Sequence, residues 1–134
     1  MGERKRIMAR TAVDVTAEEM AAYRATARHR WERQERESAW RRERAWRVAH
    51  RAARLLREQF GASHVAAFGS LTRGGLFHQR SDVDLAVWGL DEQLYYRAVS
   101  HLLSLDPSVS VDLVEAESAR PALKATIERE GILL

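Results

Sequence analysis

Residues 64–87 read HVAAFGSLTRGGLFHQRSDVDLAV, and this stretch decides the fold. One apolar run leads into a Gly-Ser pair, and a second apolar run opens with two aspartates. Short apolar runs bounded by glycine and polar residues are typical of buried strands. Residues 64–68 and 82–87 are therefore predicted to be strands, joined by a loop in which a short helix starts at Ser70.

Helices and strands alternate after this stretch. Apolar residues at helical spacing predict an amphipathic helix over residues 91–105, and alternating apolar residues predict a third strand over 109–114. Residues 121–130 are predicted to form a last helix, which Gly131 ends, and residues 132–134 a short edge strand. The sequence therefore predicts an α+β fold with a small mixed sheet flanked by helices.

A long helix is predicted ahead of this domain. Residues 16–60 contain no Gly or Pro and are dominated by Ala, Arg and Glu, all strong helix formers. Thr16 is suited to be the N-cap with Glu19 three residues later, and Gly61 supplies the stop. One helix of roughly 65–70 Å is expected, with a break near Ser38 as the alternative.

The two halves of this helix differ in their apolar residues. The second half has a dense stripe at three-to-four spacing, which should dock on a core: Ala45, Val48, Ala49, Ala52, Leu55, Leu56 and Phe60. The first half has a thin stripe: Met20, Tyr23, Ala27 and Trp31. We therefore expect residues 16–44 to pack on another chain, either a second copy or a partner protein.

Composition limits the class of protein. The chain has 134 residues, no cysteine, 22 basic and 19 acidic side chains, so one domain is expected and disulfides and thiolate metal sites are excluded. No apolar run approaches the ~20 residues of a membrane span, and no signal peptide is visible, so the expected location is the cytoplasm. Residues 1–15 are expected to be flexible, residues 16–60 to form the helix and residues 61–134 to form the domain.

The Arg-rich helix does not by itself indicate nucleic-acid binding. Residues 16–60 carry twelve Arg and seven Glu, and these alternate at spacings that give ion pairs on a solvated helix. We therefore regard nucleic acid as an unlikely partner.

Two aspartates open the second strand of the domain. Because side chains alternate along a strand, Asp82 and Asp84 should share a face with Cα atoms about 6.5–7 Å apart. Two carboxylates this close repel each other unless a cation lies between them, and a hard divalent cation is the simplest answer. Asp112, the polar residue of the third strand, would join them if the strands are neighbours. Three carboxylates around one or two magnesium ions are an arrangement for phosphoryl transfer.

The Gly-Ser turn supplies the complementary half of a nucleotide site. Gly69 allows a phosphate to approach the backbone, and the N–H groups at a helix start together with the Ser70 hydroxyl favour anions. A nucleoside triphosphate with magnesium would satisfy both the turn and the aspartates.

These motifs together resemble a known family. They are Gly69-Ser70, Arg73-Gly74, Ser81-Asp82-Val83-Asp84-Leu85 and Asp112. This pattern is similar to the nucleotidyltransferase superfamily related to DNA polymerase beta, and most closely to the minimal nucleotidyltransferases (MNT), the antitoxin partners of HEPN toxins in prokaryotes. The resemblance covers residues 48–134.

The resemblance implies specific roles. It implies that Gly69 and Ser70 hold the triphosphate, that Asp82 and Asp84 bind magnesium, with manganese as an alternative, and that Asp112 is the third carboxylate and helps to activate the attacking hydroxyl. It also implies transfer of AMP from ATP to a tyrosine hydroxyl of a partner HEPN toxin. Arg73 is expected to contact phosphate, with a structural ion pair as the alternative.

The chain departs from the family pattern in two ways. The segment between Ser70 and Asp82 has eleven residues, one more than in common members, which should produce a local bulge. The long helix is not part of a minimal domain. Two alternative functions stay open, namely nucleotide transfer to a small molecule and a non-catalytic module that binds a partner. Self-modification at Tyr95 or Tyr96 is a further option, although packing suits Tyr95 better.

Overall fold

The chain divides into two compact units, Met1–Arg36 and Glu37–Leu134. A computed structural model describes residues 15–134, so the segment expected to be flexible lies outside the described residues except for its last residue. Helix α2 (Ala17–Phe60) begins as predicted, since the Glu19 N–H donates to Thr16 Oγ1 at 3.0 Å. Nearly all side chains of the first unit that are described are exposed.

The second unit contains the apolar half of α2. Ser38 is helical and only 6% exposed, so the break allowed by the sequence is not present there. The buried positions of α2 include most of the predicted stripe: Ala45, Val48, Ala49, Ala52, Leu56 and Phe60. Gly61 ends the helix with φ +71°, a left-handed conformation that glycine adopts without strain.

Four strands form one mixed sheet in the order β3-β2-β1-β4. They are β1 (His64–Phe68), β2 (Val83–Trp88), β3 (Val111–Glu115) and β4 (Ile132–Leu133). β1 is antiparallel to β2 and β4, whereas β2 and β3 are parallel. The predicted mixed sheet and its edge strand are therefore confirmed.

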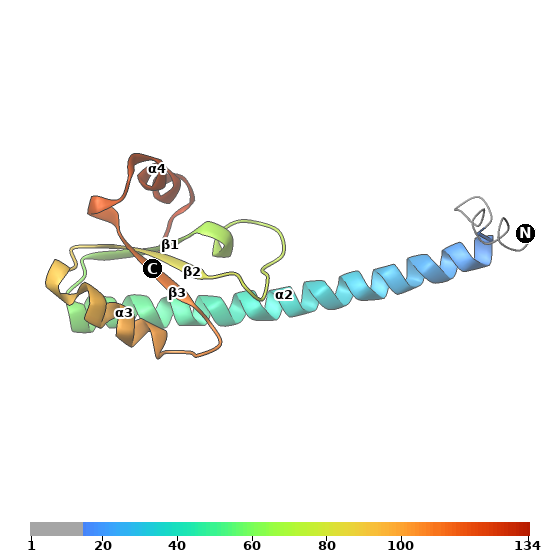
Figure 1. The fold of residues 1–134 in the computed structure, drawn as a ribbon, viewed down its shortest axis with the longest axis horizontal. Coiled ribbons are helices and arrows are strands. Elements are labelled where there is room, and N and C mark those ends of the chain that lie inside the picture. Colours follow the sequence, from blue (N-terminus) through green and yellow to red (C-terminus); the bar gives the residue numbers. More distant parts are fainter. Residues whose placement is uncertain (1–14) are drawn as a thin grey trace, which may run out of the picture. The chain divides into compact units, whose positions relative to one another are not determined.

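Helices cover both faces of the sheet (Figure 1). The apolar half of α2 and α3 (Tyr95–Leu103) pack on one face, and α4 (Pro121–Glu130) packs on the other. A short 3-10 helix, η1 (Gly69–Leu71), follows β1, and two more, η2 (Glu92–Leu94) and η3 (Ala116–Ser118), precede α3 and α4. The predicted α+β fold is confirmed.

Alternation along β2 separates the two faces. Val83, Leu85 and Val87 are fully buried in the larger core beneath α2 and α3. Ala86 lies in the smaller cluster beneath α4, so Asp84, two residues before it, faces the α4 side. The Asp84 side chain therefore lies on the face of β2 opposite the main hydrophobic core. Within residues 15–134, no helix is both long enough and apolar enough to cross a membrane.

Candidate active site

Two aspartates stand side by side where β2 and β3 run in parallel. Asp84 of β2 is paired in register with Asp112 of β3, and with Phe68, the last residue of β1, on its other side. A pocket of about 330 Å³ opens here, and its lining includes Gly69, Arg73 and both aspartates. Four residues that the sequence assigned to one site are thus brought together.

Two further predicted site residues lie beside this pocket without lining it. Ser70 follows Gly69 in η1 and is partly buried. Asp82 is exposed and immediately precedes β2, which begins at Val83, one residue later than predicted. Asp82 therefore lies outside the strand. The alternation of side chains, from which Asp82 and Asp84 were predicted to share a strand face, does not apply to Asp82.

Gly69 is required by the geometry of the turn. Its φ is +76°, and a Cβ atom built on it would collide with Oδ2 of Asp84. Only glycine combines this left-handed conformation with such a close approach to a carboxylate. The turn after β1 is consequently held directly against the Asp84 side chain, which brings the expected phosphate-binding backbone and the expected metal ligand together.

The surroundings of Asp84 disfavour the charged form of its carboxylate. The pKa of Asp84 is raised from 3.8 to about 6, mainly by burial of its carboxylate and then by the negative charges of Asp112 and Asp82, while Arg73 opposes the shift. All three aspartates therefore interact, although only two line the pocket. A cation bound among them would relieve both the repulsion and the cost of burying the charge.

The donor set fits a hard divalent cation, since all three side chains offer carboxylate oxygens. Within residues 15–134, however, no three His, Asp or Glu side chains already stand close enough to form a metal-binding group. Asp84 and Asp112 make a two-carboxylate edge, and Asp82 would have to turn toward them to complete a set of three.

Residues of α4 also line the pocket. Thr126, Arg129 and Glu130 line it. Arg73 Nε lies 3.9 Å from Glu130 Oε2, and Arg129 Nη2 lies 3.7 Å from Glu130 Oε1. The ion pair foreseen as an alternative for Arg73 is thus present, and the Arg73 side chain is still 61% exposed and lines the pocket. An anion there would compete with Glu130 for Arg73.

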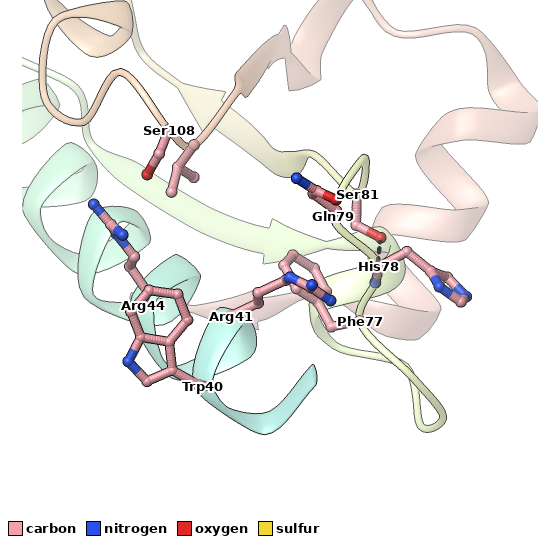
Figure 2. Close-up of a pocket in the computed structure, with 9 residues that line it drawn as sticks. Trp40, Arg41, Arg44, Phe77, His78, Gln79, Ser81 and Ser108 are labelled. Atoms are coloured by element: carbon pink, nitrogen blue, oxygen red, sulfur yellow. Dashed lines mark hydrogen bonds between the residues drawn. The ribbon is translucent and has the colours of Figure 1, made fainter. Parts of the chain in front are cut away.

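A second pocket, of about 170 Å³, lies between α2 and the end of the β1–β2 loop, which we define as residues 69–82. Figure 2 shows Trp40, Arg41 and Arg44 of α2 on one side and Phe77 and His78 of the loop on the other. Arg44 forms a two-pronged ion pair with Asp106, with N–O distances of 2.9 and 3.3 Å. This contact holds the pKa of Asp106 low, at about 2, with help from hydrogen bonds donated by Ser108.

The two tyrosines considered for self-modification are placed differently. The Tyr95 hydroxyl donates to the Leu113 carbonyl at 2.7 Å, and burial raises the pKa of Tyr95. Tyr95 packs against the core and its hydroxyl is held by this hydrogen bond, which agrees with the packing role predicted for it. Tyr96 is 83% exposed.

The chain was compared with known proteins. The family model described as "Polymerase beta, Nucleotidyltransferase" matches residues 51–134. The chain belongs to this nucleotidyltransferase family. No curated protein sequence matches it.

Solved structures similar to this nucleotidyltransferase come from toxin–antitoxin complexes. A mutant of the MntA–HpeT complex superposes with a TM-score of 0.53 at 25% identity, covering 63% of this chain and 70% of that chain. A toxin–antitoxin with AMP-PNP gives 0.51 at 30% identity, covering 60% and 66%. A complex of tri-AMPylated Shewanella oneidensis HEPN toxin with MNT antitoxin gives 0.51 at 25% identity, covering 66% and 70%. The resemblance to MNT antitoxins predicted from the motifs is confirmed.

Proposed function

We propose that this chain is a magnesium-dependent nucleotidyltransferase that moves AMP from ATP to a hydroxyl, and that the hydroxyl belongs to a tyrosine of a partner HEPN toxin. In this role it would act as an antitoxin in the cytoplasm. The observation that carries the proposal is the pairing of Asp84 with Asp112 in register, with Asp84 lying directly against Gly69 of η1. The similar structures support the choice of ATP and of the partner, because one is described with AMP-PNP and another with an AMPylated HEPN toxin.

The triphosphate would bind at the turn after β1. The left-handed Gly69 places the backbone of the turn beside Asp84, and N–H groups at a helix start together with the Ser70 hydroxyl can donate to phosphate oxygens. Arg73, exposed at the pocket wall, would exchange Glu130 for a phosphate oxygen. These contacts would place the α-phosphate beside the aspartates.

Asp84 and Asp112 would hold magnesium, with Asp82 completing the set and manganese as an alternative ion. When bound, the metal would supply Lewis-acid polarisation of the phosphate and of the attacking hydroxyl. The hydroxyl oxygen would bond to the α-phosphorus while the bond to the bridging oxygen breaks and pyrophosphate leaves. Asp112, exposed on β3, would accept the hydroxyl proton.

The proposal is tested in two steps with matched variants. Calorimetric titration of ATP with magnesium should show binding to the wild type and lower affinity in Asp84→Asn and Asp112→Asn. Asp91→Asn is the control, since Asp91 caps η2 by accepting from the Gln93 N–H, which asparagine can also do. Wild-type affinity in both site variants would refute the site.

The second step identifies the acceptor. The HEPN protein that copurifies with the chain is incubated with ATP and magnesium and then analysed by intact-mass and peptide mass spectrometry. Added AMP mass on a tyrosine, absent with Asp84→Asn and present with Asp91→Asn, is the expected result. Nucleotide binding without modification of that protein would reject the toxin as acceptor and favour a small-molecule substrate or a non-catalytic partner-binding role.

A further inference from the structure

Arg42 of α2 binds three carbonyl groups of the β1–β2 loop. Its Nη1 donates to the Leu71 carbonyl at 3.2 Å and to the Arg73 carbonyl at 2.7 Å, and its Nη2 donates to the Gly75 carbonyl at 2.6 Å. One guanidinium thus binds three carbonyls of the loop at once.

The same turn of α2 holds the loop at a second point. The Phe77 N–H donates to the buried hydroxyl of Ser38 at 2.5 Å, and the Arg42 guanidinium lies over the Phe77 ring, 5.6 Å from its centroid. Phe77 is itself only 4% exposed. The loop from Leu71 to Phe77 is therefore fixed by α2 at its backbone and at its buried aromatic side chain.

Arg47 of the same helix makes a different kind of contact. Arg47 lies 3.7 Å from Glu43, one turn back, with both side chains more than half exposed. Such pairs contribute little to stability because water screens them. Arg42 instead donates from a planar fork to backbone acceptors, a geometry that a lysine cannot reproduce because its ammonium is a single point charge.

We propose that Arg42 is a positioning residue for the nucleotide site, acting through the loop rather than by touching the nucleotide. This inference rests on the proposed function. Arg42 binds the carbonyl of Leu71, the last residue of η1, and the carbonyl of Arg73 itself, and η1 and Arg73 are the parts of the loop that would contact the triphosphate. Asp84 and Asp112 are held independently by strand pairing. Loss of Arg42 should therefore loosen the phosphate contacts while leaving the carboxylate pair in place.

The test compares Arg42→Lys with Arg47→Lys, a matched control on the same helix. Hydrogen exchange followed by mass spectrometry is measured on the full chain without nucleotide. Arg42→Lys should speed exchange in peptides covering residues 71–77 about tenfold relative to the control, with no change in β2 and β3. Ser38→Ala should speed exchange at the Phe77 amide in the same way. Unchanged exchange in residues 71–77 would overturn the proposal.

A kinetic readout separates positioning from a general loss of structure. In Arg42→Lys, KM for ATP should rise about tenfold with kcat within about twofold, as expected when an interaction contributes equally to ground-state and transition-state binding. A variant that merely lost folded protein would show lower kcat at unchanged KM. Equal KM in Arg42→Lys and Arg47→Lys would reject the positioning role. If the wild type itself neither binds nor transfers nucleotide, the proposed function fails, and the exchange experiment still decides whether Arg42 holds the loop.

Discussion

Removing the charge of Asp84 should stabilise the metal-free protein at neutral pH. The pKa of Asp84 is raised from 3.8 to about 6 in the fold. A shift of this size corresponds to at most about 3 kcal/mol, and solvent screening of a partly buried group reduces it to about 1–2 kcal/mol. Asp84→Asn keeps the shape and removes the charge, so its free energy of unfolding should exceed that of the wild type by this amount.

The sign of the pH dependence follows from the same shift. Between about pH 4 and 6 the folded protein holds the Asp84 proton more tightly than the unfolded chain does, so wild-type stability contributed by this group falls as pH rises through that window. Asp84→Asn has no titratable group at this position, so its stability lacks this pH-dependent contribution. The difference in stability between the two proteins should therefore be near zero at about pH 4 and reach its full value above about pH 7.

Urea unfolding of both proteins across this pH range, with chelator present, measures the difference directly. Other titrating groups cancel because they are common to both proteins. Adding magnesium should reverse the order, since a cation that binds only the folded wild type stabilises it by mass action. A variant less stable than the wild type at about pH 8 without metal, or a difference independent of pH, would refute the electrostatic account of this site. Asp91→Asn serves as the control for replacing a carboxylate by an amide elsewhere in the fold.

Four further predictions concern the turn and the helix. Gly69→Ala should lower stability by more than Gly75→Ala, because both glycines have positive φ but only the first would place its Cβ against another side chain; thermal unfolding of both variants tests this. Ser70→Ala should weaken ATP affinity in calorimetry while changing unfolding free energy by no more than about 1 kcal/mol. Deleting residues 1–36 should leave the second unit folded and reduce partner binding or oligomer mass in light scattering. Deleting residues 1–44 should cost about 3 kcal/mol or more, because it also removes helix contacts to the loop.

Much of the fold could be predicted because local patterns decide it. The alternation of side chains along a strand predicted which face of β2 carries Asp84. The polar position in the third strand predicted Asp112 as its partner, and the structure pairs the two residues in register. Gly69 was expected to let a phosphate approach the backbone. The structure adds a second requirement for glycine at this position, since its φ is positive and a Cβ would collide with Asp84. Asp82 was harder to place, because it precedes the strand whose alternation was used.

The roles of Ser38 and Arg42 could not be predicted from local patterns. Each makes hydrogen bonds to residues 29 to 39 positions away, so their partners depend on how α2 packs against the sheet. In the sequence, Arg42 is one of many arginines on a charged helix, and Ser38 is the residue where a break was considered. The signal in the sequence that could have indicated these roles was Ser38, a small polar residue that interrupts the Arg/Glu pattern four positions before Arg42.

The part of the chain that holds the β1–β2 loop begins before the region that the family model matches. The matched region begins at residue 51, and the predicted apolar stripe begins at Ala45. Ser38 and Arg42 lie before both, yet they hold the loop that carries Arg73. The proposed phosphate contacts would depend on that loop, whereas the carboxylates depend on strand pairing. The two halves of the proposed site are therefore supported by different parts of the chain. A truncation placed at the family boundary would keep the aspartates and lose the support for the loop that would hold the nucleotide.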